Sequence, residues 1–341
     1  MAEPSGSDSL RTSLGSLQLA NPVLSASGTF GSGWEGRDFS PLSRVGALVS
    51  KTVTVRPRHG NPPPRLAETP SGMLNSIGLE NKGADYFLAE TLPRMRTLCR
   101  RIIINIGGEA VDEFVELAER FCEAGVDALE VNLSCPNVQE GRLLFSTEAR
   151  MCERAVTAVK RVATVPVFAK LSPNVTDVTA IARAAEQGGA DGITAINTLI
   201  GMAVDWRRRR PVLGRGIGGL SGPAIKPVAL RMVHEISRAV RIPVIGVGGA
   251  RTAEDVLEFV CAGARAVQVG TAAFVDPAVL VSIVEELARL LAAAKTTITE
   301  LCGSLQAPIP VAPQPAVAPI SFAPQPAVAP RPGPAGQAEG R

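Results

Sequence analysis

The chain has 341 residues, a length that accommodates one large α/β barrel domain or two smaller domains. Hydrophobic residues at 45% supply a sizeable core, whereas aromatic residues at 4% are too scarce for a surface that stacks on nucleic-acid bases. The formal net charge of +3 indicates no particular partner. The arginine run at 207–210 is read either as a solvated loop or as a contact for an anionic partner.

The cysteine and histidine content argues against metal and disulfide frameworks. The six cysteines lie far apart with no CxxC pair, which favours reduced thiols in a cytoplasmic protein. The two histidines are too few for a histidine-rich metal site. The chain starts with polar residues, and its most apolar late stretch, 278–284, is cut off by Glu285-Glu286. We therefore expect a soluble cytoplasmic protein with no metal site and no membrane or nucleic-acid partner.

In chain order, apolar runs alternate with amphipathic stretches after a polar, disordered start at residues 1–9. The apolar runs predict strands at residues 22–25, 47–51, 102–106, 128–132, 167–171, 192–197, 244–247 and 266–269. The amphipathic stretches predict helices at residues 83–98, 109–124, 147–163, 176–188, 223–240, 252–262 and 276–295. Strands joined by helical crossovers favour a (β/α)8 TIM barrel spanning residues 10–302. A doubly wound sheet is the alternative, although no GxGxxG fingerprint follows the first strand.

Helix starts and the end of the chain carry further signals. Thr252 followed by Glu254-Asp255 predicts a helix N-terminus, and Ser146 or Thr147 is expected to cap the helix at 147–163. From residue 303 the composition changes, and Ala-Pro-Gln-Pro-Ala-Val-Ala-Pro occurs at both 312–319 and 323–330. Such a segment buries too little surface to offset its ordering entropy, so residues 303–341 are predicted to be a disordered tail, either inert or used for docking.

The stretch Glu130-Val131-Asn132-Leu133-Ser134-Cys135-Pro136-Asn137 begins as a buried strand and breaks into polar residues and a proline. Its polar side chains therefore stand at a strand's carboxyl end, where α/β folds bind ligands. Taken alone, the octapeptide is equally compatible with a turn that buries a thiol. The other strand ends decide between the two readings.

Those strand ends carry amides, hydroxyls, two lysines and glycines. They are Lys51, Thr52, Asn105, Lys170, Asn197, Thr198, Gly248, Gly249, Gly270 and Thr271. The set contains no carboxylate pair for glycoside hydrolysis and no metal cluster, and it suits a planar, hydrogen-bonding, anionic ligand.

Glycines after the last two predicted strands favour a phosphate site, because backbone N–H groups there approach a phosphate beside a helix N-terminus. Two tight turns are the alternative reading. The glycine-rich piece 214–222, followed by Pro223 at or near a helix start, is a weaker candidate for another wall of that site. The long stretch 56–81 shows no clear secondary structure and is interpreted as an ordered loop that closes on a small ligand.

Taken together, these motifs resemble the class 1 dihydroorotate dehydrogenases, and most closely the flavin-containing catalytic subunit of class 1B. The resemblance covers residues 11–300. It is carried by Ala26-Ser27-Gly28-Thr29-Phe30-Gly31, Gly60-Asn61-Pro62 with Pro64-Arg65, Asn75-Ser76-Ile77-Gly78-Leu79, Asn132-Leu133-Ser134-Cys135-Pro136-Asn137, Lys170-Leu171-Ser172-Pro173-Asn174, Ile196-Asn197-Thr198-Leu199-Ile200-Gly201 and Gly218-Gly219-Leu220-Ser221-Gly222-Pro223.

The resemblance implies a (β/α)8 barrel that holds FMN and oxidises dihydroorotate to orotate in pyrimidine biosynthesis. Cys135 is similar to the base that removes the C5 proton, and Lys170 to the residue beside the flavin's pyrimidine end. The implied substrate contacts are Lys51, Asn75, Ser76, Ile77, Gly78, Leu79, Asn132, Asn137, Asn197 and Thr198. The implied FMN contacts are Thr29, Lys51, Thr52, Asn105, Asn132, Lys170, Ile196, Gly222, Gly248, Gly249, Gly270 and Thr271.

One loop departs from the family pattern. After Asn137 the family carries adjacent glycines, whereas this chain has Gly141-Arg142-Leu143-Leu144-Phe145-Ser146-Thr147. We expect a stiffer or differently shaped lid over the same barrel.

Class 1B enzymes pair with an iron–sulfur, FAD-containing subunit that passes electrons to NAD, within a homodimer core or a heterotetramer. The chain lacks a dinucleotide fingerprint and clustered cysteines, so such a relay must come from another polypeptide. A fumarate-using class 1A-like enzyme and another FMN barrel acting on dihydropyrimidines are the catalytic alternatives. A non-catalytic barrel that binds a phosphate ligand is the third.

Overall fold

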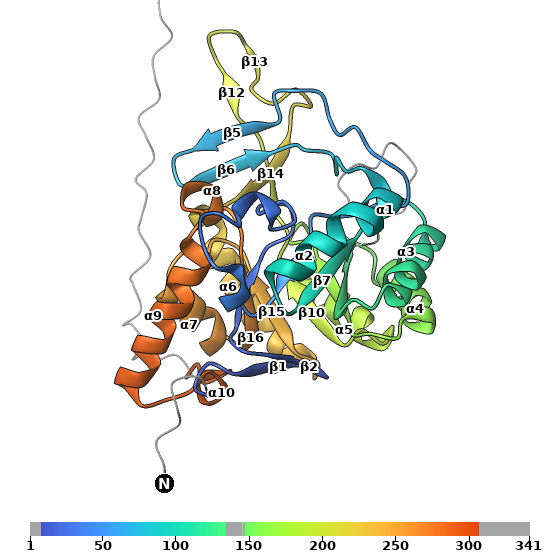
Figure 1. The fold of residues 1–341 in the computed structure, drawn as a ribbon. Helices are drawn as coiled ribbons and strands as arrows, with labels where there is room; N and C mark the ends of the chain where they lie inside the picture. The colour runs from blue at the N-terminus through green and yellow to red at the C-terminus, as the bar shows by residue number, and fades with distance from the viewer. Residues whose placement is uncertain (1–7, 134–144, 146, 307–341) are drawn as a thin grey trace, which may run out of the picture. The chain divides into compact units, whose positions relative to one another are not determined.

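A closed parallel barrel forms the centre of the protein, as seen in a computed structural model that describes residues 8–133, 145 and 147–306 (Figure 1). Its strands follow the order β3-β16-β15-β10-β9-β8-β7-β4. They are β3 (Val23–Ser25), β4 (Leu48–Val49), β7 (Ile102–Ile106), β8 (Ala128–Asn132), β9 (Val167–Leu171), β10 (Gly192–Ala195), β15 (Val244–Val247) and β16 (Ala264–Val269). A parallel bridge between Leu24 and Ala47 joins the two ends of this sheet. The predicted (β/α)8 barrel is confirmed, and the doubly wound alternative is wrong.

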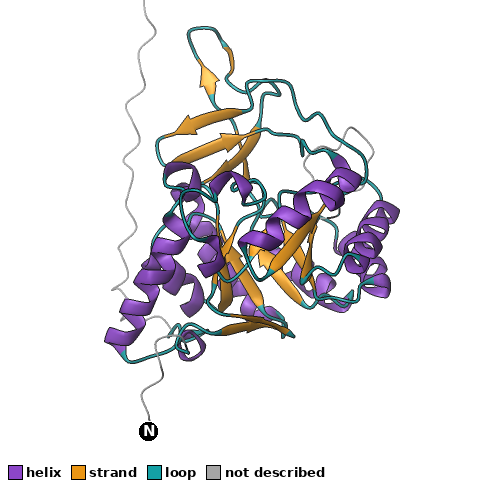
Figure 2. Ribbon diagram, viewed as in Figure 1, coloured by secondary structure: helices purple, strands orange, loops and turns teal. Residues whose placement is uncertain are grey.

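Helices cover the outside of the barrel (Figure 2). They are α1 (Gly83–Tyr86), α2 (Leu92–Leu98), α3 (Val111–Glu123), α4 (Ala149–Val162), α5 (Val178–Gln187), α6 (Lys226–Ala239), α7 (Ala253–Cys261), α8 (Ala272–Val275), α9 (Val279–Ala294) and α10 (Ile298–Leu301). Short 3₁₀ turns occur at η1 (Trp34–Gly36), η2 (Leu42–Arg44) and η4 (Pro223–Ile225), and a π-helical turn, η3 (Phe87–Thr91), joins α1 to α2. The predicted helices are thus present, with the one at 83–98 interrupted by that π turn.

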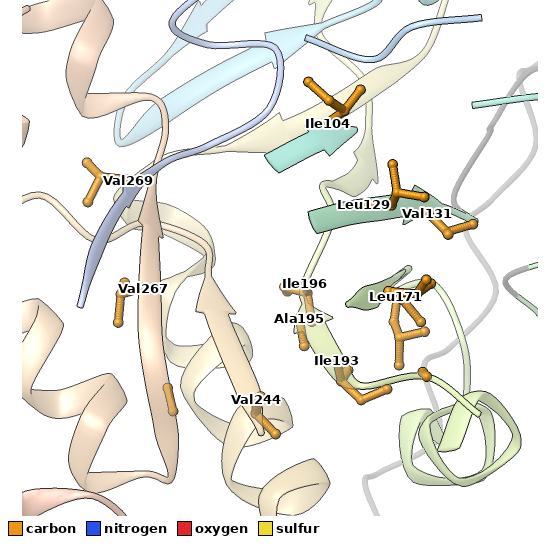
Figure 3. Packing of buried hydrophobic residues seen from close by; sticks show 14 of the residues in the cluster. Ile104, Leu129, Val131, Leu171, Ile193, Ala195, Ile196, Val244, Val267 and Val269 are labelled. Carbon is orange, nitrogen blue, oxygen red and sulfur yellow. The ribbon is translucent and has the colours of Figure 1, made fainter. Parts of the chain in front are cut away.

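Side chains alternate between the two faces of each barrel strand, and the outward set packs against the helices. Ile104, Leu129 and Val131 belong to the large cluster between the barrel and its helices, and Figure 3 shows them on neighbouring strands. Ile103 and Ala128, their immediate neighbours in sequence, belong instead to a separate apolar cluster inside the barrel. Because successive side chains point to opposite faces, Glu130 must point into the barrel.

A β-hairpin closes the amino-terminal end of the barrel. It comprises β1 (Thr12–Leu14) and β2 (Leu17–Leu19), and it lies at the opposite end from β5 and β6 (Figure 1). Leu14, Leu17 and Leu19 are buried together with Leu24 and Phe168 in the apolar cluster inside the barrel. This hairpin was not predicted. Its leucines fill the amino-terminal end of the barrel interior, and this packed apolar layer is called the floor.

A second, antiparallel sheet stands at the carboxyl-terminal end of the barrel strands, with order β11-β14-β6-β5 (Figure 1). Its strands are β5 (Leu66–Thr69), β6 (Gly72–Asn75), β11 (Leu199–Gly201) and β14 (Gly218–Ser221), and a small ribbon of β12 (Val204–Asp205) and β13 (Arg210–Pro211) extends beyond it. The interpretation of 56–81 as an ordered loop without clear secondary structure is therefore wrong for residues 66–69 and 72–75. Within the glycine-rich piece 214–222, residues 218–221 form β14, a strand that was not predicted. Both were missed because the pairing β6–β14 joins segments far apart in sequence.

The two capping predictions have different outcomes. Thr252 Oγ1 accepts a hydrogen bond from the Asp255 N–H at 3.2 Å, and Asp255 Oδ2 accepts one from the Thr252 N–H at 3.0 Å, which confirms the cap of α7. Glu148 occupies the N-cap position of α4 and makes no side-chain capping bond, so the prediction of Thr147 as the N-cap residue is wrong, and the alternative, Ser146, lies outside the described residues. The predicted disorder of the termini falls mainly on residues 1–7 and 307–341, which lie outside the described residues.

Candidate active site

The barrel interior is layered, because every second residue of a strand points inward. Ile103 and Phe168 belong to the apolar floor. Two residues further along the same strands are Asn105 and Lys170, and Glu130 follows Ala128 in the same way. The floor thus changes into a polar layer one step closer to the carboxyl ends of the strands.

This polar layer is a connected hydrogen-bond network around Glu130. Asn105 Nδ2 donates to Glu130 Oε1 at 2.6 Å, and Lys170 Nζ donates to the same oxygen at 3.3 Å. Gln268 Nε2 donates to Glu130 Oε2, while Gln268 Oε1 accepts from Lys170 Nζ at 3.2 Å. Glu130 was not assigned a role from the sequence, although a carboxylate inside an apolar strand was a readable signal.

Glu130 and Lys170 form an ion pair inside the barrel. Their side chains are 0% and 6% exposed, and both are bound by neutral amides as well as by each other. Removing two charges from water is costly, and such a pair is tolerated only where good geometry and further hydrogen bonds compensate it. Side chains from several barrel strands therefore hold the Lys170 ammonium group in a fixed position beneath the mouth of the barrel.

A second group of predicted residues lies above the polar layer. Asn132 Nδ2 donates to Thr52 Oγ1 at 3.2 Å, and Asn197 Nδ2 contacts Asn132 Oδ1 at 3.4 Å. The backbone N–H of Thr198 donates to Asn197 Oδ1 at 2.8 Å. Three strand ends, those of β4, β8 and β10, therefore bring their amides and hydroxyls into one connected group. Its members are the donors and acceptors that a planar heterocycle with alternating carbonyl and N–H groups requires.

Lys51 and Thr29 border this group without entering the network. Lys51 follows β4, its side chain is half-buried, and its N–H donates to the Gly31 carbonyl at 3.1 Å. Thr29 Oγ1 donates to the Ala26 carbonyl at 3.1 Å. The loop 26–31 after β3 and the end of β4 are thus tied together, and this places a second cation at the same end of the barrel.

The glycine turns at the carboxyl ends of β15 and β16 meet the β14 end. Gly248 and Gly249 have φ of +135° and +83°, and Gly222 has φ of +91°, values that L side chains rarely adopt. A Cβ on Gly249 would lie 2.7 Å from the Gly222 carbonyl oxygen, so the two turns are in direct contact. Thr271 Oγ1 donates to Ser221 Oγ at 2.8 Å from the other side. Gly270 stands immediately before Thr271, and so the predicted glycines are gathered in one place.

The segment 75–79 continues from β6 beside these groups. Asn75 Nδ2 donates to the Gly219 carbonyl at 3.2 Å, which ties the segment to β14. Ser76 Oγ accepts from Asn61 Nδ2 at 2.9 Å. Leu79 has φ of +55°, and the half-buried Ile77 and Gly78 precede it. This part of the predicted loop is ordered by its own contacts with the second sheet.

The predicted base and one predicted substrate amide, Cys135 and Asn137, lie outside the described residues, as do most of the altered loop residues 138–147. Leu133 is the last described residue before that gap and is 1% exposed. Ile196, a predicted cofactor contact, is buried and donates its N–H to the Val247 carbonyl at 2.9 Å. The described residues on this side of the gap therefore end two positions before the predicted base.

The described residues contain no group of three or more His, Cys, Asp or Glu side chains that suits a metal ion. Within the same part of the chain, no helix is both long enough and apolar enough to cross a membrane.

Comparison with known proteins places the chain in a family. A family model described as dihydroorotate dehydrogenase matches residues 9–291, which is more than half of the chain. The chain belongs to the dihydroorotate dehydrogenase family. Members of this family are flavin-dependent oxidoreductases, and the chain is accordingly an enzyme.

Curated relatives from several bacteria share the same printed description, dihydroorotate dehydrogenase B (NAD(+)), catalytic subunit. The protein from Geobacillus kaustophilus is 54% identical over 83% of this chain and 90% of its own length. The protein from Anoxybacillus flavithermus is 53% identical over 83% of this chain and 91% of its own length. The protein from Phocaeicola vulgatus is 48% identical over 87% of this chain and 99% of its own length. The term catalytic subunit in these names implies a partner subunit.

Proposed function

We propose that this chain is the catalytic subunit of an NAD-linked dihydroorotate dehydrogenase, which oxidises (S)-dihydroorotate to orotate with FMN as the immediate acceptor. The observation that carries the proposal is the convergence, at one end of a barrel that belongs to this family, of a connected group of strand-end amides with two cations, Lys51 beside it and Lys170 beneath it. Orotate is a planar ring carboxylate, dihydroorotate is its counterpart with C5 and C6 saturated, and both carry carbonyl and N–H edges. Amides match the ring edges, and a lysine matches the carboxylate.

The residues present fit FMN. Two buried polar atoms in the barrel interior, Asn105 Oδ1 and Thr194 Oγ1, have no hydrogen-bond partner among the described residues. Buried polar groups are normally satisfied, so an unpartnered pair beneath the mouth is consistent with a polar ligand there. The glycine turns at Gly222, Gly248 and Gly249 supply the close backbone approach that a phosphate needs. Lys170 would face the flavin ring, and the turns would hold the phosphate.

In the proposed mechanism, the chain's own residues bind, orient and deprotonate the substrate. Lys51 binds the carboxylate, while Asn75, Asn132, Asn137 and Asn197 orient the ring edges. The contacts of Asn132 with Thr52 and Asn197 restrain its amide, so that little ordering remains to be done when substrate binds. Ser76 to Leu79 and Thr198 complete the substrate surroundings.

Cys135 acts as the base. Its sulfur takes the proton from C5 of dihydroorotate while the hydride on C6 leaves, and the C5=C6 double bond of orotate forms from the C5–H electron pair. Bound FMN would supply the two-electron chemistry as the acceptor of that hydride. A thiol has an unperturbed pKa of about 8.5, so modest electrostatic help brings it into the working range.

Electrons would leave through an iron–sulfur, FAD-containing partner subunit that reduces NAD. The described cysteines, Cys99, Cys122, Cys152, Cys261 and Cys302, are free thiols and form no cluster site. The printed names of the relatives, which combine NAD with a catalytic subunit, favour this relay over fumarate as acceptor.

An anaerobic absorption spectrum tests the proposal. We expect the purified full chain to be yellow and to lose its oxidised-flavin band when dihydroorotate is added, whereas 5,6-dihydrouracil should leave the band unchanged. A Lys51→Met variant should need a much higher dihydroorotate concentration for the same bleaching, because dihydroorotate carries the carboxylate that Lys51 binds.

Two outcomes contradict the proposal. Bleaching by dihydrouracil without bleaching by dihydroorotate would favour the other FMN barrel enzymes that act on dihydropyrimidines. A colourless protein that does not take up FMN would favour a phosphate-binding barrel without redox function.

A further inference from the structure

Glu130 has a position that none of the proposed substrate or cofactor contacts explains. It lies in the middle of β8, is 0% exposed, and is the anion to which Lys170 is paired. Its register partner on β7 is Asn105, and Asn132, two residues further along β8, is the register partner of Lys170. Glu130 therefore sits one layer below the substrate amides and directly beside the cation.

The hydrogen bonds of Glu130 span the barrel. In the closed sheet, β15, β10 and β9 separate β8 from β16 on one side, and β3, β4 and β7 separate them on the other. Gln268 on β16 nevertheless donates to Glu130 Oε2, so this contact crosses the barrel interior from one wall to the opposite wall. A carboxylate anchored to opposite walls has little freedom to rotate.

This anchoring fixes Lys170 as well. Its Nζ is held 3.3 Å from Glu130 Oε1 and 3.2 Å from Gln268 Oε1, on a side chain that is 6% exposed. A lysine ammonium on a four-carbon stem is otherwise mobile and strongly hydrated. Glu130 and Gln268 thus decide where this positive charge stands.

The pairing also decides how much positive potential reaches the mouth of the barrel. Glu130 and Lys170 carry opposite unit charges and are screened little by water, since both are buried. A group just above the layer therefore experiences a cation that is partly neutralised. Replacing the carboxylate with a neutral amide would expose the full ammonium charge to that group.

We infer that Glu130 is a positioning residue that holds Lys170 and partly neutralises it, and that it thereby sets the reduction potential of the flavin. This inference rests on the proposed function, because Lys170 acts on the redox reaction only if a flavin lies above it. Reduced flavin carries negative charge near the ring that Lys170 would face, so an uncompensated ammonium stabilises the reduced form.

The direct test is an equilibrium measurement in the full chain. At a fixed ratio of orotate to dihydroorotate under anaerobic conditions, Glu130→Gln should raise the ratio of reduced to oxidised flavin on the order of tenfold, as a partly screened unit charge within one site does. Glu130→Asp, which keeps the charge, should remain much closer to the wild type. A role in packing alone would not produce this difference between the charge-removing and the charge-keeping variant.

A matched control changes the same type of side chain outside the barrel. Glu116→Gln removes a half-exposed carboxylate on α3 that pairs with Arg120 on the next helical turn. It alters the net charge by the same amount and should leave the flavin equilibrium unchanged.

The Glu130→Gln variant leaves the Lys170 ammonium without its anion and could fail to fold for that reason. A double-variant cycle with Lys170 keeps the inference testable in that case. Lys170→Met should lower the reduced fraction, because it leaves a buried carboxylate below the flavin. Glu130→Gln with Lys170→Met removes both charges and should restore most of that loss. If the double variant equals Lys170→Met, or if Glu130→Gln lies within twofold of the wild type, the inference is wrong.

The failure of this inference can be distinguished from failure of the proposed function. A wild-type protein that binds no flavin, or whose flavin does not respond to dihydroorotate, contradicts the function itself. A wild-type flavin that responds normally, with no effect of Glu130→Gln on its equilibrium, contradicts only the role of Glu130. The heat-unfolding midpoint of the flavin-free variants reports separately on the cost of unpairing the buried charge.

Discussion

At the scale of single residues, the proposed chemistry needs one thiol that ionises readily among several that do not. Burial raises the pKa of Cys152 to about 12, with the nearby Glu153 carboxylate adding to the effect. Burial also raises the pKa of Cys99 and of Cys302. These thiols keep their protons at neutral pH and so hold no thiolate that could act as a base, and Cys152 belongs to the cluster between the barrel and its helices.

We therefore predict that Cys135→Ala retains FMN but slows single-turnover flavin reduction by dihydroorotate by about two to four orders of magnitude, the range over which general bases contribute. Cys135→Ser should be slow near neutral pH and recover as pH rises, because a hydroxyl is a far weaker acid than a thiol. Stopped-flow absorbance under anaerobic conditions measures both rates.

Cys152→Ala is the matched control for that experiment. It removes a buried thiol whose hydrogen-bond contact is the Ile181 carbonyl at 3.7 Å, so it should lower stability slightly and leave the reduction rate unchanged. If Cys135→Ala reduces its flavin as fast as Cys152→Ala does, Cys135 is not the base.

Several site residues were predictable because strand ends in a parallel barrel converge, so Thr52, Asn132 and Asn197 follow from strand positions alone. Glu130 was not predicted as a functional residue because the run 126–131 was read for its apolar character. Gln268 faces Glu130 only because the sheet closes into a barrel, and the order of polar and apolar residues along the sequence does not reveal this contact.

At the scale of elements, the start of α7 holds one of the glycine turns in place. Asp255 Oδ2 accepts hydrogen bonds from the N–H groups of Arg251 and Thr252 at 2.8 and 3.0 Å, and its other oxygen pairs with Lys226 on α6. Burial would raise the pKa of Asp255, but the hydrogen bonds from Lys226 and the two N–H groups outweigh it and lower that pKa. The turn Gly248-Gly249 lies immediately before these residues.

Because its pKa is lower in the folded state, Asp255 stabilises the fold at pH values above about 4, the unfolded pKa, and this contribution is lost as pH falls through the folded pKa. We predict that Asp255→Asn lowers the free energy of unfolding by about 1–2 kcal/mol at pH 7, as loss of a helix cap does. The difference from the wild type should shrink as the pH falls below about 4. Urea unfolding at several pH values measures it.

Glu258→Gln provides the control for the capping prediction. Its carboxylate contacts the same Lys226 at 2.8 Å, but its side chain is 49% exposed, so the exchange should change stability little. Weaker FMN retention in Asp255→Asn than in Glu258→Gln would show that the cap of α7 holds the glycine turn that is proposed to bind the FMN phosphate. Equal stability of the two variants at pH 7 would contradict the prediction.

Elements with strong local signals were the predictable part of the fold. The strand Ile102–Ile106 is a continuous apolar run except for Asn105, and α7 has its complete capping box in sequence. The second sheet has short strands with half-exposed residues, such as the β14 sequence Gly-Gly-Leu-Ser, and it forms only by pairing with a distant segment. Such strands owe their stability to partners rather than to propensity.

At the scale of the whole molecule, the proposed function assigns NAD reduction to a partner subunit, and the described residues contain no site for a metal cluster. We predict that the purified chain with dihydroorotate turns over with an artificial dye acceptor but forms no NADH. Addition of the iron–sulfur, FAD-containing subunit should start NADH formation. The near-ultraviolet absorbance of NADH measures this reaction. NADH formation by the chain alone would contradict this division of labour, and rapid reoxidation by fumarate would favour the class 1A-like alternative.

The hairpin Thr12–Leu19 and the bonds across the interior have a kinetic consequence for the complete enzyme. Leu14, Leu17 and Leu19 are at most 5% exposed and seal the amino-terminal end, and the contact between Glu130 and Gln268 bars the passage above them. Under the proposed function, dihydroorotate must then enter and orotate must leave through the same opening at the carboxyl-terminal end of the barrel. Bound orotate would therefore obstruct the next dihydroorotate, so that product release must precede substrate binding in each cycle.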